Sequence, residues 1–271
     1  MDGITALIAG EGSLPVAIAS RLTDRGEPPV VYSLRESVGA LSRYALEIVK
    51  LSKPDLGFAV GDLKKRGVKN IIMAGTVSKT LAFKPSLFDL TTQKFLAGLI
   101  FRDDHSLLGA IVDFLEKEGF CVLSYKDIIS DLLAAKGLIA GREPTKDEAN
   151  DIEYGRSICK VLVPLSFGQT IVVNKRAVIA VEAMEGTDAT LLRAGSLCRG
   201  GVVVKMMRQD QDERFDIPTV GPATLENMAQ AGLTCLALHA GWTLIMELPK
   251  FRELAEKEKI AVVGVDPCRS F

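Results

Sequence analysis

The chain has 271 residues, an apolar fraction of 48% and a formal net charge of −1, which is the composition of an ordinary globular protein. The 33 Lys and Arg against 34 Asp and Glu exclude the basic footprint of bulk nucleic-acid binding. No apolar run reaches the roughly 18 residues that a membrane helix needs. Five widely spaced cysteines without a CxxC pair, and an N-terminus without a basic leader, predict a reduced cytoplasmic protein.

The first half of the chain alternates strands with helices. Apolar runs predict strands at 4–9, 30–33, 70–75 and 120–123. Helical patterns are present at 15–22, 40–46, 56–66, 94–98 and 106–118. This alternation is typical of βαβ units, in which a parallel sheet is covered by helices on both faces. We therefore predict an α/β domain over residues 1–135.

The second half has a different pattern. A stretch rich in Gly and Pro predicts a linker at 136–146, which leads into a helix from about residue 146. Runs at 170–173 and 177–181 flank Asn174-Lys175-Arg176 and predict an antiparallel hairpin. Further strands are predicted at 201–205, 234–238 and 260–263, and helices at 222–231 and 250–258. We therefore predict a mixed α/β domain over residues 147–271.

Two glycine-containing loops follow predicted strands of the first domain. Gly10, Gly12 and Ser13 precede the first helix, where glycines and a helix N-terminus let backbone N–H groups approach a phosphate. Gly75 and Ser78 follow the third strand. Ligands of open parallel sheets bind beyond the carboxyl ends of the strands, so both loops are candidate phosphate contacts. An ordinary structural turn is the alternative for each loop.

The dinucleotide fingerprint is incomplete in this sequence. Pro15 stands where a third glycine is required, and no acid ends the second strand, where the chain reads Ser33-Leu34-Arg35 followed by Glu36. The fingerprint uses that acid to hold a ribose hydroxyl. The sequence therefore gives little support to an NAD-binding domain.

Carboxylates gather in two places. Glu182, Glu185 and Asp188 lie within seven residues at the end of a predicted strand, and Asp104 belongs to an Asp pair that opens a helix. Clustered carboxylates are unfavourable unless a cation or solvent compensates them. Magnesium binds through one or two carboxylates plus substrate phosphates. The alternative is a solvated turn, in which the aspartates cap the helices that follow.

Cations and a further acid follow in the second domain. Arg193 and Lys205 are candidates to neutralise phosphate, and Asp216 leads a proline-fixed loop where it could hold a metal or activate water. His239 follows a predicted strand. The alternatives are an exposed turn for Asp216 and a structural role for His239.

The chain resembles the LpxI-type UDP-2,3-diacylglucosamine pyrophosphatases of Gram-negative lipid A synthesis, and the resemblance covers nearly its whole length. The matching segments are 8–15, 103–104, 168–169, 180–188 and 215–222. The runs Val181-Glu182-Ala183-Met184-Glu185-Gly186-Thr187-Asp188 and Asp216-Ile217-Pro218-Thr219-Val220-Gly221-Pro222 together are the most specific. His105 departs from the small residue expected after the paired aspartates.

The resemblance implies a Rossmann-like N-terminal domain, a mixed α/β C-terminal domain and an active site between them. It implies Mg²⁺-dependent hydrolysis of the substrate to UMP and 2,3-diacylglucosamine 1-phosphate, which is lipid X. It makes Asp216, Asp188 and Glu185 the candidate catalytic acids, and Asp216, Asp104 and Glu182 the candidate Mg²⁺ ligands. The candidate substrate contacts are Gly10, Gly12, Ser13, Gly75, Ser78, Gln169, Thr187, Arg193, Lys205, Thr219, Thr224 and His239.

An acylated substrate predicts weak peripheral contact with the cytoplasmic face of the inner membrane. A homodimer is our expectation because twofold dimers are the commonest soluble oligomers. Two alternatives remain open, a carrier that binds the nucleotide-lipid without cleaving it and an NAD(P)-dependent oxidoreductase. The acid cluster argues against the first, and the incomplete glycine fingerprint argues against the second.

Overall fold

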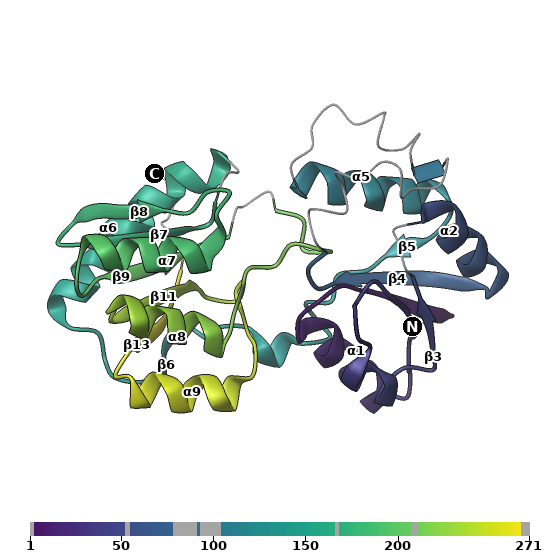
Figure 1. The fold of residues 1–271 in the computed structure, drawn as a ribbon, viewed down its shortest axis with the longest axis horizontal. Helices are drawn as coiled ribbons and strands as arrows, with labels where there is room; N and C mark the ends of the chain where they lie inside the picture. Colours follow the sequence, from purple (N-terminus) through teal and green to yellow (C-terminus); the bar gives the residue numbers. More distant parts are fainter. Residues whose placement is uncertain are drawn as a thin grey trace. The chain divides into compact units, whose positions relative to one another are not determined.

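The computed structural model describes residues 3–51, 55–77, 91–92, 104–165, 168–207 and 211–266, with the backbone alone at 104–106. These residues form two compact units (Figure 1). The first unit comprises Met1–Ser130 and Asp212–Asp216, and the second comprises Asp131–Gln211 and Ile217–Phe271. Both are built from sheets and helices, which confirms the predicted α/β class.

The sheet of the first unit has the strand order β3-β2-β1-β4-β5. The strands are β1 (Ile4–Ala9), β2 (Val30–Ser33), β3 (Glu47–Lys50), β4 (Val68–Ala74) and β5 (Cys121–Val122). Every pairing is parallel. The order reverses direction between β1 and β4, as in a Rossmann-like sheet. The loops after β1 and β4 therefore lie at the switch point of this sheet.

Helices cover both faces of this sheet. They are α1 (Leu14–Asp24), α2 (Leu56–Lys65) and α5 (Asp104–Lys117), with the 3₁₀ helix η1 (Gly39–Arg43). Val60 and Leu63 of α2 and Val112 and Leu115 of α5 share one core cluster with the sheet. Figure 1 shows α1 on the opposite face. This arrangement is the one expected for right-handed crossovers.

Two features of the first unit differ from the sequence prediction. The helix expected at 40–46 is the shorter η1, and β3 follows it without having been predicted. β3 is a four-residue edge strand whose two end residues are charged and exposed, so it lacks the apolar run that marks a buried strand. The helix expected at 94–98 lies outside the described residues.

The sheet of the second unit is mixed, in the order β6-β13-β11-β9-β7-β8. The strands are β6 (Gly137–Ala140), β7 (Thr170–Asn174), β8 (Ala177–Val181), β9 (Val202–Lys205), β11 (Cys235–His239) and β13 (Ala261–Val265). β9, β11 and β13 are parallel, whereas β6 and β7 run antiparallel to their neighbours. The predicted β7–β8 hairpin is confirmed.

Helices also cover both faces of the second sheet. They are α6 (Lys146–Leu162), α7 (Gly186–Leu197), α8 (Pro222–Ala231) and α9 (Leu248–Lys257), with the 3₁₀ turns η3 (Ser130–Leu132) and η4 (Val163–Leu165). Val202 and Val204 of β9 pack in the cluster of α6, and Val203 packs in the cluster of α7, α8 and α9. This alternation follows from the two-residue period of a strand. Among the described residues, no helix is both long and apolar enough to cross a bilayer.

The segment 136–146, expected as a linker, contains strand β6. Its glycines serve close packing and turns rather than flexibility. A side chain at Gly141 would place its Cβ only 1.9 Å from the carbonyl oxygen of Ile260, and Gly141 has φ +68°. A further difference is that Asp212–Asp216, assigned by sequence to the second domain, packs with the first unit.

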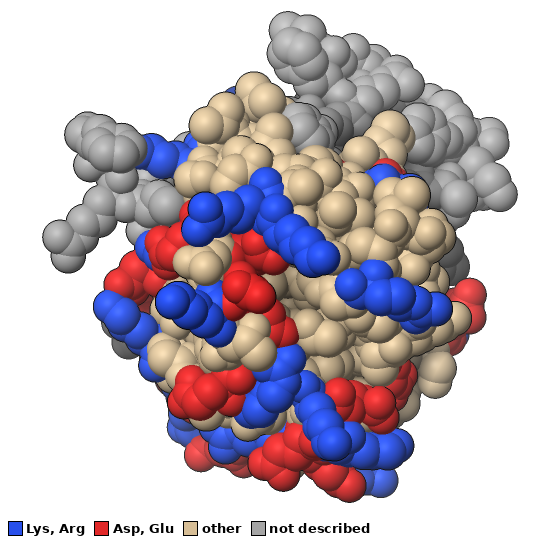
Figure 2. Space-filling view, turned by 90° about the vertical axis from the view of Figure 1, so that its left-hand side faces the viewer, with Lys and Arg blue, Asp and Glu red and all other residues tan. Residues whose placement is uncertain are grey.

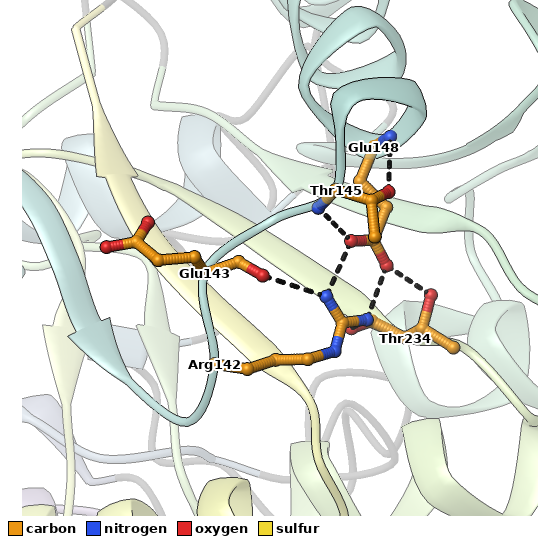
Figure 3. A network of polar contacts seen from close by, with 5 residues as sticks. All are labelled: Arg142, Glu143, Thr145, Glu148 and Thr234. Carbon is orange, nitrogen blue, oxygen red and sulfur yellow. Dashed lines mark hydrogen bonds and ion pairs between the residues drawn. The ribbon is translucent and has the colours of Figure 1, made fainter.

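A network of polar contacts anchors the start of α6 (Figure 3). Glu148 is 8% exposed, and its carboxylate accepts two hydrogen bonds of 2.7 Å from Arg142. It also accepts the Thr234 hydroxyl at 2.6 Å and the Thr145 N–H at 2.8 Å. Thr145 and Glu148 form a capping box. The network joins the β6–α6 connection to the residue that precedes β11, so it stabilises the unit from the end opposite to the candidate site described next.

Candidate functional site

Polar residues from distant parts of the sequence converge at one edge of the second sheet. Lys205 ends β9 and lies opposite Thr170, which begins the antiparallel strand β7. Val181, the last residue of β8, pairs with Ile171, so Glu182 emerges at the same edge. His239 ends β11, which is parallel to β9. The topology thus collects Glu182, Lys205 and His239, which the sequence predicted separately, at the carboxyl ends of the parallel strands.

A hydrogen-bonded ring joins Lys205 to Glu182. The Lys205 Nζ donates to the Thr170 hydroxyl and to the Thr187 hydroxyl, each at 3.1 Å. The Thr187 hydroxyl in turn donates to Glu182 Oε1 at 2.7 Å. Lys205 is only 7% exposed and Thr170 only 1%. A buried ammonium requires a compensating charge. The Glu182 carboxylate carries that charge, and the threonine hydroxyls link it to Lys205.

The charges around Glu182 keep it ionised. Burial by itself raises the pKa of this carboxyl group. The positive charge of Lys205, the hydroxyls of Thr170 and Thr187 and the backbone N–H of Gln169 oppose burial, and the net pKa lies below its ordinary value. The Gln169 N–H lies 3.3 Å from Glu182 Oε2. The carboxylate is therefore a fixed anion directed toward Lys205.

Close backbone packing places the Glu182 carboxylate. A Cβ at Gly168 would lie 2.1 Å from the carbonyl oxygen of Glu182, so only glycine fits there. The Glu182 N–H donates to the Thr170 carbonyl at 2.8 Å. The Gly168-Gln169 pair, which the sequence matched to the family without a mechanism, thus has a structural reason: it brings the start of β7 against the residue after β8.

His239 connects the ends of two adjacent strands. It is 6% exposed, and its Nδ1 accepts the Met207 N–H at 3.3 Å. Its ring lies 6.0 Å from that of Trp242. Because Nδ1 is an acceptor, the neutral ring carries its proton on Nε2. His239 therefore holds the chain just beyond Lys205 against β11, a structural contact at the site.

The loop after Asp216 is held by a separate sheet of two short strands. β10 (Thr219–Val220) pairs in parallel with β12 (Leu244–Ile245). The Thr219 hydroxyl donates to the Ile217 carbonyl at 3.0 Å. The Thr224 hydroxyl accepts the Gly221 N–H at 3.3 Å, which caps α8. These contacts give both predicted threonines local structural roles and hold the loop rigid.

Asp216 belongs to a different unit from Lys205. Its N–H donates to the Asp212 carbonyl at 3.1 Å, and Phe215 packs on the core of the first unit. Arg214 binds Asp212 and also Glu116 of α5, with the Arg214 to Glu116 distance at 2.7 Å. The five-residue segment that ends at Asp216 is therefore anchored to the first unit, and the next residue already belongs to the second.

The two glycine loops of the first unit pack against each other. Glu11 and Thr76 exchange backbone hydrogen bonds of 2.7 and 3.0 Å. A Cβ at Gly10 would lie 2.6 Å from the Thr76 carbonyl oxygen, and one at Gly75 would lie 2.7 Å from that of Glu11. Both glycines are thus required for loop contact. Gly12, with φ +97°, has open space around it.

Arg35 lies near the position that a ribose-binding acid occupies in dinucleotide-binding domains. Its guanidinium donates to the carbonyls of Gly10 and Gly12 at 3.1 and 2.7 Å. Ser13 is the N-cap of α1, and its side chain makes no capping hydrogen bond. A cation bound to the loop carbonyls, in place of a carboxylate, does not fit the usual ribose contact. Ser78 lies outside the described residues.

The remaining acids of the 182–188 run are exposed. Glu185 Oε1 accepts Arg193 at 2.7 Å and the Thr190 hydroxyl at 3.2 Å. A hydrogen bond to its own backbone N–H and the contact with Arg193 lower the pKa of Glu185. Arg193 also donates to the Val181 carbonyl at 2.9 Å. Asp188 is an exposed residue in the first turn of α7. Only Thr187 of this helix start joins the ring with Lys205.

The predicted Mg²⁺ ligands differ in how well they fit a metal. Both carboxylate oxygens of Glu182 accept hydrogen bonds from the protein, and the charge of Lys205 already compensates the carboxylate, so a metal cation there would be repelled by a nearby ammonium group. Asp216 has the chemistry of a hard-cation ligand that could share Mg²⁺ with substrate phosphates. The side chain of Asp104 is not described. Within the described part of the chain, no three His, Cys, Asp or Glu side chains gather as a metal site.

Thr170 is the site residue that the sequence analysis did not single out. In the sequence it is the first residue of an otherwise apolar strand. Its role is evident only from the pairing of β7 with β9, in which buried Thr170 lies opposite buried Lys205. A polar residue at the first position of an otherwise apolar run is a weak indication without that pairing.

Together, a Rossmann-like unit and a mixed α/β unit with a lysine–threonine–glutamate ring define a two-unit α/β protein with a polar site at a sheet edge. The LpxI N-terminal domain model matches residues 4–132, and the LpxI C-terminal domain model matches residues 135–263. A protein of Caulobacter vibrioides named UDP-2,3-diacylglucosamine pyrophosphatase LpxI is 32% identical over 274 residues, which cover 96% of this chain and 97% of that protein. The chain belongs to the LpxI family.

Proposed function

We propose that this protein hydrolyses the pyrophosphate bond of UDP-2,3-diacylglucosamine to UMP and 2,3-diacylglucosamine 1-phosphate, the lipid X of lipid A biosynthesis, with Mg²⁺. The observation that carries the proposal is the full-length similarity to a relative of that name. The ring of Lys205, Thr187 and Glu182 supports it, because phosphoanhydride chemistry requires fixed groups near developing negative charge.

The sheet edge of the second unit supplies the phosphate-binding groups in this proposal. The ammonium of Lys205 lies beside the N-terminus of α7, where Thr187 is the second residue of the helix. A fixed cation and a helix N-terminus both favour an anion. Because these groups are held before substrate binds, little reorganisation accompanies the reaction. Gln169 lies beside them through its backbone contact with Glu182.

Asp216 is the proposed catalytic carboxylate, which acts as a base. In hydrolysis, the water oxygen forms a bond to one phosphorus, the bridging P–O bond breaks, and the water proton passes to a base. A carboxylate fixed at a rigid loop can orient that water and accept its proton. The contacts of Asp212 and Arg214 anchor the segment on one side, and β10 fixes the loop on the other.

Mg²⁺, when bound, would neutralise phosphate oxygens, and Asp216 is the described carboxylate that would hold it. Asp104 would be a second ligand. Glu182 is left out of this role because the Lys205 ammonium already compensates its charge. Lys205 and Thr187 act on the phosphates independently of the metal.

Exposed apolar side chains suit the acyl part of the substrate. Met184, two residues after Glu182, is 92% exposed, and Leu165, three residues before Gly168, is 62% exposed. The backbones of Gly168 and Glu182 are in contact, so Leu165 and Met184 each lie within three residues of that contact along the chain. Figure 2 shows a face of the second unit on which a broad area lacks charged side chains. These features support weak peripheral contact with a membrane through apolar groups.

The test is UMP release from UDP-2,3-diacylglucosamine with Mg²⁺ and with EDTA. We expect Mg²⁺-dependent release by the wild-type protein. Asp216→Ala should abolish turnover yet retain substrate binding, because the acid acts mainly in the transition state. The exposed Asp127, changed to Asn, is the matched control and should leave turnover unchanged. Bound but uncleaved substrate with the wild-type protein would indicate a carrier, and turnover by Asp216→Ala would remove this residue from the mechanism.

A further inference from the structure

We infer that Glu182 is a positioning residue that acts through Lys205, and that it is not a metal ligand. The inference rests on the proposed function, because it assigns Lys205 to the phosphates of the substrate. Sequence reasoning grouped Glu182 with the Mg²⁺ ligands, since it begins a run of three acids. Its contacts in the structure assign it differently.

Glu182 is surrounded by donors from this chain. The Thr187 hydroxyl donates to Oε1 at 2.7 Å, and the Gln169 N–H lies 3.3 Å from Oε2. The Thr170 hydroxyl and the charge of Lys205 also stabilise the ionised carboxyl group. A metal bound to these oxygens would displace several of these donors and would lie near an ammonium group, which is unfavourable.

The ring also fixes the orientation of both threonine hydroxyls. Each hydroxyl accepts a hydrogen bond from Lys205, and each stabilises the Glu182 carboxylate as a donor. With one proton per hydroxyl, the carboxylate determines which way both protons point. Glu182 thereby holds the two acceptors that locate the Lys205 ammonium at the end of β9.

The consequence for the reaction is specific. When Glu182 is neutral, the Lys205 ammonium has no fixed counter-charge, and the hydroxyl protons can turn toward other acceptors. The ammonium is then less well placed for a phosphate, so substrate binds more weakly. Metal binding is unaffected, because no Mg²⁺ ligand has been removed.

The first experiment is a double-mutant cycle with Glu182→Gln and Lys205→Met, with UMP release as the readout. A hydrogen bond to a charged group corresponds to about a 10- to 100-fold effect. We expect Glu182→Gln to lower kcat/KM by about that factor, mainly through KM. The kcat/KM of the double variant should lie within about threefold of that of Lys205→Met, because both changes disrupt the same interaction. Independent, additive losses would overturn the inference.

The second experiment measures the Mg²⁺ concentration for half-maximal activity. Glu182→Gln should leave it unchanged within about twofold, whereas loss of a metal ligand would raise it about tenfold or more. Glu226→Gln, an exposed carboxylate on α8, is the control for charge removal. A raised Mg²⁺ requirement in Glu182→Gln alone would show that Glu182 holds the metal. Inactive wild-type protein would instead refute the proposed function.

Thr170 gives a test that does not rely on charge removal. It is 1% exposed, so it reaches substrate only through the ring. Thr170→Val keeps the volume and removes the hydroxyl, and it should lower kcat/KM by about 3- to 10-fold with the Mg²⁺ requirement unchanged. Thr170→Ser restores the hydroxyl and should restore kcat/KM to within about threefold. Equal activity of the Val and Ser variants would overturn the inference, provided that Trp242 fluorescence shows both to be folded.

Discussion

Neutralising Glu148 should destabilise the second unit by about 3 kcal/mol at neutral pH. Its carboxylate accepts four hydrogen bonds, from two Arg142 nitrogens, the Thr234 hydroxyl and the Thr145 N–H, all between 2.6 and 2.8 Å. Burial raises the pKa of Glu148, but these donors outweigh it and lower the pKa from 4.5 to about 2. Each pKa unit corresponds to about 1.4 kcal/mol, so the ionised form stabilises the fold by about 3 kcal/mol.

The sign of this effect determines its pH dependence. The pKa of Glu148 is lower in the folded than in the unfolded protein, so its contribution is complete above about pH 5. It falls as the pH drops from about 4.5 toward about 2. The stability difference between wild type and Glu148→Gln should therefore shrink to about 1 kcal/mol at pH 3. The other carboxyl groups titrate in the same way in both proteins, so their contributions to the free energy of unfolding cancel in this difference.

Urea unfolding at pH 7, 5 and 3 measures the effect. Trp242 is the only tryptophan of the chain, and it lies in the second unit, so its fluorescence reports that unit. Glu153→Gln is the matched control on the same helix, because Glu153 is 65% exposed in its ion pair with Arg156. We expect the control to change the free energy of unfolding by less than about 0.5 kcal/mol. A Glu148→Gln effect equally small at pH 7, or one that stays constant down to pH 3, would refute the reasoning.

Three further changes should alter stability in predictable directions, each measured by urea unfolding. Thr243 is fully buried and its hydroxyl has no hydrogen-bond partner among the described residues, so Thr243→Val should be neutral or stabilising. Gly10→Ala should destabilise the first unit by about 1–3 kcal/mol because its Cβ would collide with the Thr76 carbonyl, whereas Gly61→Ala in α2, with open space around it, should stabilise it. Asp151 accepts the N–H groups of Lys175 and Arg176 at 2.8 and 2.7 Å, so Asp151→Ala should cost about 1–3 kcal/mol. Equal effects of the two glycine variants, a destabilised Thr243→Val or an unchanged Asp151→Ala would contradict these assignments.

The sequence predicted the strands and helices that show one clear local pattern of apolar and polar residues. Buried parallel strands such as β9 and β11 are apolar on both faces, so each is visible as an apolar run. The sequence did not predict two of the four edge strands of the two larger sheets, β3 and β6, whereas it did predict the edge strands β5 and β8. β3 has exposed charged ends, and β6 lies between glycines that resemble those of a linker. Each is only four residues long, and its pairing, with β2 for β3 and with β13 for β6, is what marks it as a strand.

The residues of the candidate site also divide into those that the sequence alone could suggest and those that it could not. Lys205, Glu182 and Thr187 could be proposed from the sequence because polar residues at strand ends and helix starts are recognisable. Thr170 could not, because its importance depends on lying opposite Lys205 across two antiparallel strands. The role assigned to Glu182 differs from that of its neighbours, because the three acids look alike in sequence but Glu185 and Asp188 are exposed and only Glu182 joins the ring with Lys205.

The amino-acid sequence by itself determined the α/β class, the parallel sheet of the first unit, the hairpin of the second and the family resemblance, because these depend on local periodicity and on motifs. The tertiary structure decided which polar residues meet. It placed Lys205, Thr170, Thr187 and Glu182 in one ring and attached Asp216 to the first unit. It also used Gly10 and Gly75 for loop contact. Hydrogen bonds, burial and close backbone approach act between residues far apart in the chain, so only the folded arrangement fixes them.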